Sequence, residues 1–315
     1  MATATQTRTA TATATATRTR TPTPTAAGSL NPNPPAQTVK LIFIHHSTGS
    51  GWLDDSGRLG ITLRDNNYFV SDTNYGWGPD GIGNLTDIGH WWTWFVGPNR
   101  NTYTAALYAE SAQHASYSRL ATDPGGQNQI IMFKSCFPNS DIGGNPNDPP
   151  TVGDNPLRGQ YVGSSLTVAN AKGIYNDILG YFATRQDKLF VVITAPPLTQ
   201  ASTSAAAAAN ARAFNNWLVN DWLSGYAYNN VVVFDYYSVL TSNGGNTNTN
   251  DLGWATGNHH RWRNGAIEHI QTVASNYCAY GSSSGDSHPT AAGHQKASGE
   301  FAQLLNIWYH RWSGQ

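Results

Sequence analysis

The sequence predicts an α/β fold, a three-layer α/β/α sandwich around a mainly parallel central sheet. Two observations predict it. Short, β-rich apolar runs alternate along the chain with longer segments of helical character. Turn-forming residues separate the two kinds of segment. Because parallel strands are joined through helical crossovers, this alternation indicates βαβ units with right-handed crossovers and helices on both faces of the sheet.

The expected strands are apolar runs that follow the Thr/Pro-rich start of the chain. Each run is only a few residues long, and Pro196-Pro197 closes the fourth. We expect strands at residues 40–44, 68–70, 129–133, 189–194 and 231–234.

The expected helices rest on spacing and composition. Across residues 162–184, apolar residues that include Leu166, Ile174 and Ile178 recur at mixed spacings of three and four, which is typical of a helix packed on one face. The segment 203–224 is rich in Ala, the residue with the highest helix propensity. Further helices are expected at residues 57–67 and 291–309.

Residues 1–36 differ from the rest of the chain. They consist mainly of Thr, Ala and Pro, so they lack the large apolar side chains that a core needs. Thr/Pro-rich stretches of this kind are typical of linkers between modules of secreted proteins. We expect a disordered linker at 1–36, a catalytic domain at 37–315, and a further module upstream; a disordered N-terminal tail is the alternative.

Composition narrows the class of protein. Lys plus Arg number 18, Asp plus Glu number 19, and only 12% of residues are charged, so no global field attracts nucleic acid. No run of 18 apolar residues predicts a membrane span, and the first residues do not resemble a signal peptide. A surface made polar by Asn, Ser, Thr, Gly and Tyr favours a secreted, extracellular protein.

The chain has two cysteines, Cys136 and Cys278. An even count permits one disulfide in an oxidising compartment and equally permits two buried thiols. We expect the disulfide, which would brace loops near the carboxyl ends of the strands.

Polar clusters follow the expected strands, where ligands bind in parallel α/β sheets. A further cluster precedes the last expected helix. Together they are His45-His46-Ser47-Thr48-Gly49, Asn74-Tyr75-Gly76-Trp77-Gly78, Ser135-Cys136-Phe137-Pro138-Asn139 and Gly285-Asp286-Ser287-His288-Pro289-Thr290.

This arrangement resembles the SGNH, or GDSL-like, hydrolase family over residues 38–312, and the resemblance implies its flavodoxin-like α/β/α fold. It makes Ser47 the nucleophile, Asp286 and His288 its partners in a triad, and Gly78 and Asn139 oxyanion-hole residues. Three features depart from the family pattern. In the second cluster Pro79 stands where a Gly usually precedes Asp, here Asp80, which leaves Gly78 or Gly76 for the oxyanion role. His45-His46 stand where Gly-Asp usually precedes the nucleophile, and one residue instead of two separates Asp286 from His288.

The chemistry explains why these residue types are needed. A serine hydroxyl is a weak nucleophile until a histidine removes its proton and a carboxylate orients that histidine. The backbone N–H groups of Ser47 and Gly78 and the amide of Asn139 would stabilise the oxyanion. Ester hydrolysis requires only this set, so neither a metal nor a cofactor is implied. An α/β-hydrolase would instead carry its serine mid-chain in a G-x-S-x-G elbow.

Aromatic and histidine residues suggest the substrate. His45 and His46 are adjacent on an extended segment, so their side chains point to opposite faces and cannot chelate one ion. His46, Trp77 and Trp254 are candidates for substrate contacts, because tryptophans among Gly and Asn residues suit stacking on sugar rings. His259-His260-Arg261-Trp262 is expected to be a polar loop.

The sequence therefore favours a secreted serine esterase that removes O-acetyl groups from a polysaccharide. Three alternatives stay open. They are a lipid or general carboxylesterase on the same scaffold, a noncatalytic carbohydrate-binding module and a metal-dependent deacetylase that uses some of the ten histidines.

Overall fold

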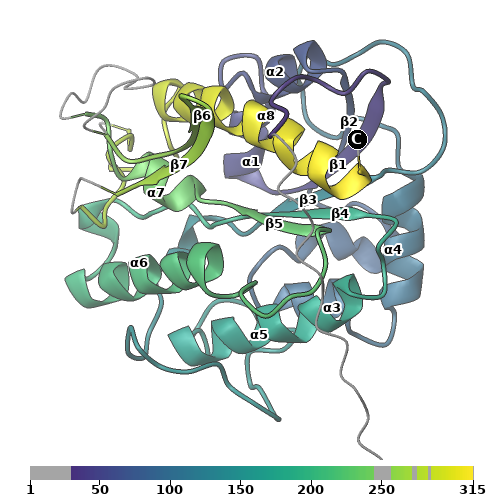
Figure 1. Cartoon of the computed structure of the whole chain (residues 1–315). Coiled ribbons are helices and arrows are strands. Elements are labelled where there is room, and N and C mark those ends of the chain that lie inside the picture. Colours follow the sequence, from purple (N-terminus) through teal and green to yellow (C-terminus); the bar gives the residue numbers. More distant parts are fainter. Residues whose placement is uncertain (1–29, 245–256, 272–274, 283–284, 315) are drawn as a thin grey trace, which may run out of the picture.

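A five-stranded sheet forms the centre of the computed structural model, which describes residues 30–244, 257–271, 275–282 and 285–314 (Figure 1). The strand order is β2-β1-β3-β4-β5, and every neighbouring pair is parallel. The predicted α/β/α class is therefore confirmed. The strands are β1 (Val39–Ile44), β2 (Tyr68–Thr73), β3 (Ile130–Lys134), β4 (Leu189–Ile193) and β5 (Val231–Phe234).

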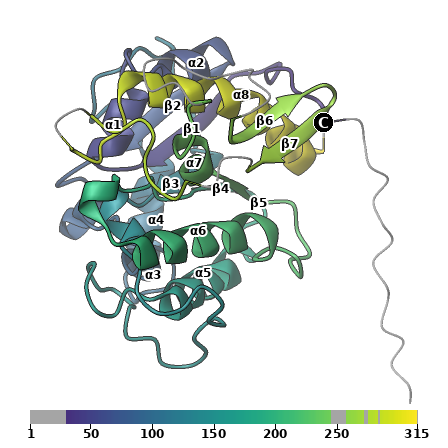
Figure 2. The same cartoon turned by 90° about the vertical axis from the view of Figure 1, so that its left-hand side faces the viewer.

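The strands are buried along their whole length because helices cover both faces of the sheet (Figure 2). Alternate residues of one strand enter different cores. In β1, Ile42 and Ile44 belong to one apolar cluster, whereas Leu41 and Phe43 belong to the other. Burial on both sides is why most of these strands read in the sequence as nearly continuous apolar runs. The exception is β2, which ends in the buried polar residues Ser71, Asp72 and Thr73 and was expected only at 68–70.

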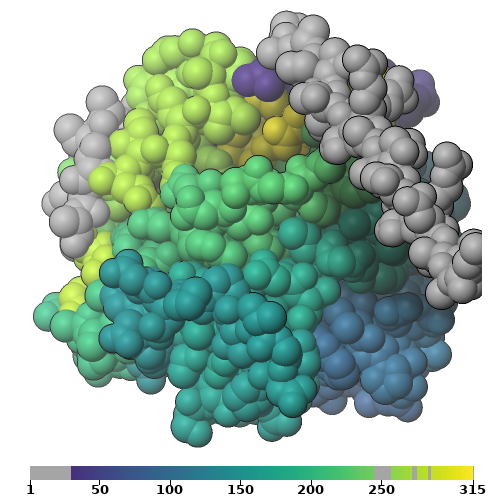
Figure 3. Space-filling view, turned by 60° about the horizontal axis from the view of Figure 1, so that its bottom comes forward, coloured from purple at the N-terminus to yellow at the C-terminus, as the bar shows by residue number. Residues whose placement is uncertain are grey.

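Four helices cover one face of the sheet, and α5 and α6 lie on the outside of the molecule on this side, in teal to green (Figure 3). Aromatic residues fill this core: Trp91 and Phe95 lie 4.9 and 5.4 Å, centroid to centroid, from Phe133 of β3. The helices are α3 (His90–Phe95), α4 (Arg100–Ala109), α5 (Val168–Phe182) and α6 (Ala205–Asn220).

The opposite face packs around Trp52, which is fully buried. Its ring stacks on Tyr236 at 4.5 Å, and its indole N–H donates to Ser298 Oγ over 2.9 Å. The helices on this side are α1 (Ser47–Leu53), α2 (Leu59–Asp65), α7 (Tyr236–Leu240) and α8 (Ala291–Ser313).

Capping residues set the helix ends that periodicity alone misplaces. The expected helix at 162–184 begins instead at Val168, because the Thr167 side chain accepts a hydrogen bond from the backbone N–H of Asn170. The expected helix at 203–224 begins at Ala205 behind Ser204, which caps Ala207 in the same way. The helices α1, α3, α4 and α7 were not expected.

The expectation of a polar loop at 259–262 is wrong. These residues lie in β6 (His259–Arg263), which pairs antiparallel with β7 (Ala266–Ile270). The two turn residues, Asn264 and Gly265, both have positive φ, as tight hairpin turns require. Since α8 packs against β6, and His259 and His260 are buried, these polar residues form a buried strand.

The ordered domain begins before the expected boundary at residue 36. The carbonyl oxygens of Pro32 and Asn33 accept hydrogen bonds from Asn306 and His310 of α8, at 2.8 and 3.0 Å. Residues 32–33 therefore belong to the folded unit. Within the described ranges, no helix combines the length and hydropathy that a membrane crossing requires.

Candidate active site

The structure brings Ser47, His288 and Asp286 into one hydrogen-bonded chain at the carboxyl ends of the strands. Ser47 is the first residue of α1, directly beyond β1, and its Oγ lies 2.9 Å from His288 Nε2. His288 Nδ1 lies 2.8 Å from Asp286 Oδ1. Residues 241 positions apart in the sequence thus meet in the order that a nucleophile, a base and its orienting carboxylate require.

The carboxylate fixes the protonation of the ring. Hydrogen bonds from the backbone N–H and the ring of His288 lower the pKa of Asp286, so this side chain is ionised and acts only as an acceptor. His288 Nδ1 therefore carries the donated hydrogen, and Nε2 is left to accept the hydroxyl hydrogen of Ser47.

The single residue between Asp286 and His288 fits a local turn. Asp286 Oδ1 also accepts the backbone N–H of His288 over 3.1 Å, which is the hydrogen-bond pattern of an Asx turn. The loop is held from outside by Thr199, whose N–H donates to Ser287 Oγ and whose hydroxyl donates to the Gly285 carbonyl, each at 3.2 Å. One-residue spacing is therefore compatible with the contact geometry.

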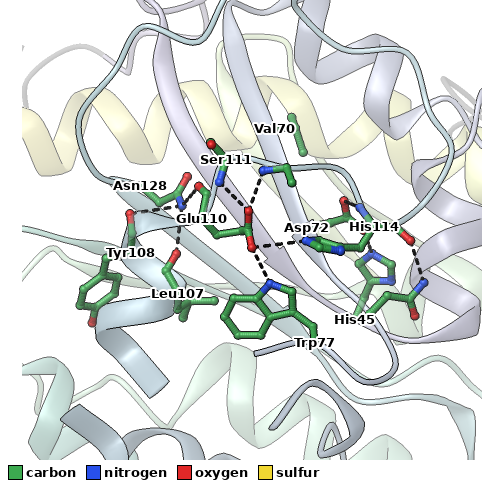
Figure 4. A network of polar contacts seen from close by, with 12 residues as sticks. His45, Val70, Asp72, Trp77, Leu107, Tyr108, Glu110, Ser111, His114 and Asn128 are labelled. Atoms are coloured by element: carbon green, nitrogen blue, oxygen red, sulfur yellow. Dashed lines mark hydrogen bonds and ion pairs between the residues drawn. The ribbon is translucent and has the colours of Figure 1, made fainter. Parts of the chain in front are cut away.

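A polar network includes His45, two residues before Ser47 in the sequence, together with Asp72 and His114 (Figure 4). His45 is fully buried, and its Nε2 lies 3.1 Å from Asp72 Oδ2. The other oxygen of Asp72 accepts the hydroxyl of Tyr117 and the backbone N–H of His114, at 2.9 and 2.8 Å. A Cβ on Gly49 would stand 2.3 Å from the Cβ of His45, so only glycine lets α1 start this close to the ring.

Both ring nitrogens of His46, a candidate for substrate contact, are hydrogen-bonded within the protein. Its Nε2 donates to the Gly83 carbonyl, and its Nδ1 accepts the hydroxyl of Thr86 over 2.9 Å. Burial lowers the pKa of His46 to about 4, so the ring is neutral. The exposed ring of Tyr75 stacks on it at 3.8 Å. Tyr75, not His46, is therefore the residue exposed to solvent here.

Asn139 lies in the 3₁₀ turn η2 (Phe137–Ser140) with its amide held at both ends. Its Oδ1 accepts the backbone N–H of Ile88 over 2.8 Å, and its Nδ2 donates to Asp87 Oδ1. Burial raises the pKa of Asp87, an effect that the hydrogen bond from Asn139 opposes. Sequence reasoning did not identify Asp87, which follows no expected strand.

Gly78 precedes the 3₁₀ turn η1 (Pro79–Asn84) with φ of 76°. The described contacts do not join it to Ser47; the loop reaches the nucleophile segment through Gly83 and Tyr75. Trp77 is a core residue, because its ring stacks on Trp94 and is only 8% exposed. Its ring is therefore closed to a sugar. Trp254, the third candidate, lies outside the described residues.

The expected disulfide is absent, and both cysteines, which lie in the described part of the chain, are free. The sulfur of Cys136 points to the nucleophile instead, 3.6 Å from Ser47 Oγ and 3.1 Å from Thr48 Oγ1. Burial alone would raise the pKa of Cys136, but the Lys134 ammonium and hydrogen bonds from Thr48 and Ser47 lower it overall. Burial raises the pKa of Cys278 to about 11.

A cleft of about 450 Å³ opens beside the triad, and we call it the side cleft. It adjoins His288 through Phe137, whose ring meets the histidine ring edge-on at 4.8 Å. The sequence pointed to the segment that contains Phe137 but not to the cleft. Its lining residues are Phe137, Pro138, Asp141, Val162, Gly163, Leu198 and Ser202.

Comparison with known proteins found little similarity. No family model and no curated protein matches the chain. One solved structure is similar, that of a carbohydrate esterase whose active site is described as displaying divergent catalytic and non-catalytic binding functions. The two share 13% identity and a TM-score of 0.34, over 87% of this chain and 68% of the other. These values mark a distant likeness. Among the described residues, no group of three His, Cys, Asp or Glu side chains is arranged to hold a metal.

Proposed function

We propose that this protein is a serine esterase of the SGNH type that hydrolyses acyl esters through an acyl-enzyme on Ser47. The observation that carries the proposal is the continuous hydrogen-bonded chain from Ser47 through His288 to Asp286. In the acylation step, Ser47 Oγ attacks the ester carbonyl as His288 Nε2 takes its proton. Asp286 stabilises the imidazolium that forms.

Breakdown of the tetrahedral intermediate releases the alcohol, which takes the proton back from His288. Water then attacks the acyl-enzyme, again with His288 as base, and the carboxylic acid leaves. We assign the oxyanion to the backbone N–H of Ser47 and the amide of Asn139, with Gly78 as a third candidate donor. Loss of one such donor typically costs about 10²- to 10³-fold in kcat.

For the substrate we propose O-acetyl groups on a polysaccharide outside the cell. Three features support this choice. The composition is polar with few charges, the Thr/Pro-rich start is typical of linkers in modular secreted enzymes, and the side cleft adjoins the triad. On this proposal a further module lies upstream of the linker.

The test is active-site labelling with a fluorophosphonate, followed by mapping of the modified residue. We expect label on Ser47, and we expect Ser47→Ala to lose both labelling and acetate release from acetylated polysaccharide. Ser56→Ala is the matched control, because Ser56 is exposed in the loop after α1 and lies outside the triad. Label on another residue, or full activity in Ser47→Ala, would overturn the mechanism.

A substrate panel separates the alternatives. Faster turnover of long-chain aryl esters than of acetylated polysaccharide would favour a lipid or general carboxylesterase. Polysaccharide binding without hydrolysis would favour a noncatalytic module. Loss of activity in a chelator, with Ser47→Ala still active, would favour a metal-dependent deacetylase.

A further inference from the structure

The side cleft shares its walls with the candidate catalytic groups. Phe137 and Pro138 belong to the same 3₁₀ turn as Asn139, so one wall is continuous with a proposed oxyanion donor. On the other side, Leu198 precedes Thr199, which holds Ser287 and Gly285 through the hydrogen bonds described above. A group seated in the cleft is therefore next to an acyl group on Ser47.

The apolar lining suits the C–H face of a sugar ring. Phe137, Pro138, Val162 and Leu198 supply carbon surface, and the volume of about 450 Å³ falls within the usual size of small-molecule sites. Polar groups at the rim, Asp141 and Ser202 among them, can meet the hydroxyl groups of the same ring.

The charge at this rim has one sign. Asp141 is exposed, and its Oδ1 accepts only a neutral hydroxyl, that of Thr203 at 2.9 Å. Asp286, on the loop that Thr199 holds next to Leu198, keeps 51% of its side chain exposed and has a lowered pKa. The lining residues include neither Lys nor Arg. A carboxylate on the substrate would thus meet like charge with no counter-charge from the lining.

We infer that the side cleft binds the ester-bearing sugar as a neutral ring and discriminates against uronic acid residues, with Asp141 as the determinant of this specificity. The inference rests on the proposed esterase function and narrows its substrate to acetylated neutral glycans. A carboxylate oxygen of Asp141 accepts hydrogen bonds from sugar hydroxyls, whereas it repels a uronate at close range.

The experiment compares kcat/KM on acetylated xylan and on acetylated polygalacturonate. We expect the wild type to favour the neutral polymer by roughly ten-fold or more at low salt, and added salt to narrow that difference. Asp141→Asn should raise turnover of the acidic polymer several-fold and lower turnover of the neutral one, because an amide oxygen is a weaker acceptor for sugar hydroxyls than a carboxylate. Asp141→Lys should raise turnover of the acidic polymer further. Asp65→Asn is the control, an exposed acid on α2 at the opposite face of the sheet.

Equal turnover of the two polymers by the wild type, or an equal change on both in Asp141→Asn, would overturn the inference. Hydrolysis of a small aryl acetate separates this failure from failure of the proposed function. If that ester is cleaved in a Ser47-dependent manner while polymer charge has no effect, only the inference fails. If it is not cleaved, the esterase proposal itself fails. If a variant folds poorly, the salt dependence of kcat/KM on the two polymers, measured with the wild-type protein, tests the inference instead.

Discussion

Asp87 is the residue that fixes the amide of Asn139. Its carboxylate accepts one hydrogen of Asn139 Nδ2, and the backbone N–H of the neighbouring Ile88 binds the amide oxygen. The same contacts fix the direction of the second hydrogen on Asn139 Nδ2. Within the protein, this hydrogen is directed to the Cys136 carbonyl oxygen, 3.4 Å away. If Asn139 is the oxyanion donor that we propose, Asp87 acts through it as a positioning residue.

We expect Asp87→Ala to lower kcat about ten-fold with little change in KM, because an oxyanion donor loses its orientation. Asp87→Asn should recover most of the loss, since an amide oxygen can still accept from Asn139 Nδ2. Steady-state kinetics on an aryl acetate measures both parameters. An unchanged kcat in Asp87→Ala would show that Asn139 needs no such support.

The two cysteines should differ in reactivity. Cys136 has a lowered pKa and lies beside Ser47 Oγ, whereas the pKa of Cys278 is raised to about 11. Because the thiolate is the reactive form, iodoacetamide at neutral pH should modify Cys136 first and block the proposed esterase. Peptide mass spectrometry locates the adduct, and Cys136→Ala should resist inactivation. Faster loss of activity than of the Cys136 thiol would contradict this order.

The sequence predicts where some of the site residues lie but not where others lie. Ser47 and Asn139 follow expected strands, and parallel strands end at one edge of the sheet. The Asp286/His288 pair was predicted from its place before the last helix, in the resemblance to the SGNH pattern. The sequence does not predict the direction in which an individual side chain points. Trp77 enters the core and Cys136 turns to Ser47, and each outcome depends on neighbours that are distant in the sequence.

At the scale of elements, the β6–β7 hairpin depends on Glu300 of α8. Glu300 Oε1 lies 2.7 Å from His259 Nδ1, and its Oε2 accepts the backbone N–H of His260 over 2.8 Å. Both side chains of the His259–Glu300 pair are fully buried. A polar run such as His259-His260-Arg261-Trp262 cannot be identified as a buried strand from sequence, because its partner comes 40 residues later.

We expect Glu300→Ala to lower the free energy of unfolding by about 3–5 kcal/mol, the usual cost of leaving one partner of a buried pair uncompensated. Glu300→Gln keeps an acceptor for the backbone of His260 and should cost less. Urea unfolding followed by circular dichroism gives both values. Glu268→Ala is the comparison, since Glu268 pairs with Arg261 nearer the surface. Equal losses in the two alanine variants would argue against a special role for Glu300.

The strands of the central sheet were the most predictable elements, since burial on both faces makes most of their positions apolar. The helices α3 and α4 were not predicted from the sequence. Residues 90–95 of α3 include three tryptophans and one phenylalanine. Aromatic residues have modest helix propensity, so packing against Phe133 and Phe182 stabilises this helix more than local preference does.

For the whole molecule, buried neutral histidines couple stability to pH. Burial lowers the pKa of His46 and His90 to about 4, and that of His260 and His294 to about 3. In the unfolded chain each returns toward its ordinary value of about 6.5. Between these values the unfolded state binds more protons than the folded state, so protonation favours unfolding.

Stability should therefore be full above pH 6.5 and fall as the pH drops toward 4, by about 1.4 kcal/mol per pH unit for each proton taken up on unfolding. Aspartates with lowered pKa values, such as Asp235, act in the same direction at lower pH, below about 4. Urea denaturation at half-unit steps from pH 7.5 to 4.5 covers the histidine window, in which the raised pKa of Asp87 acts in the opposite direction. His294→Gln should make the slope shallower by one proton, because His294 is buried against Tyr236 and Gln does not titrate. If the urea midpoint does not change between pH 6.5 and 5, these histidine rings gain protons within the folded state.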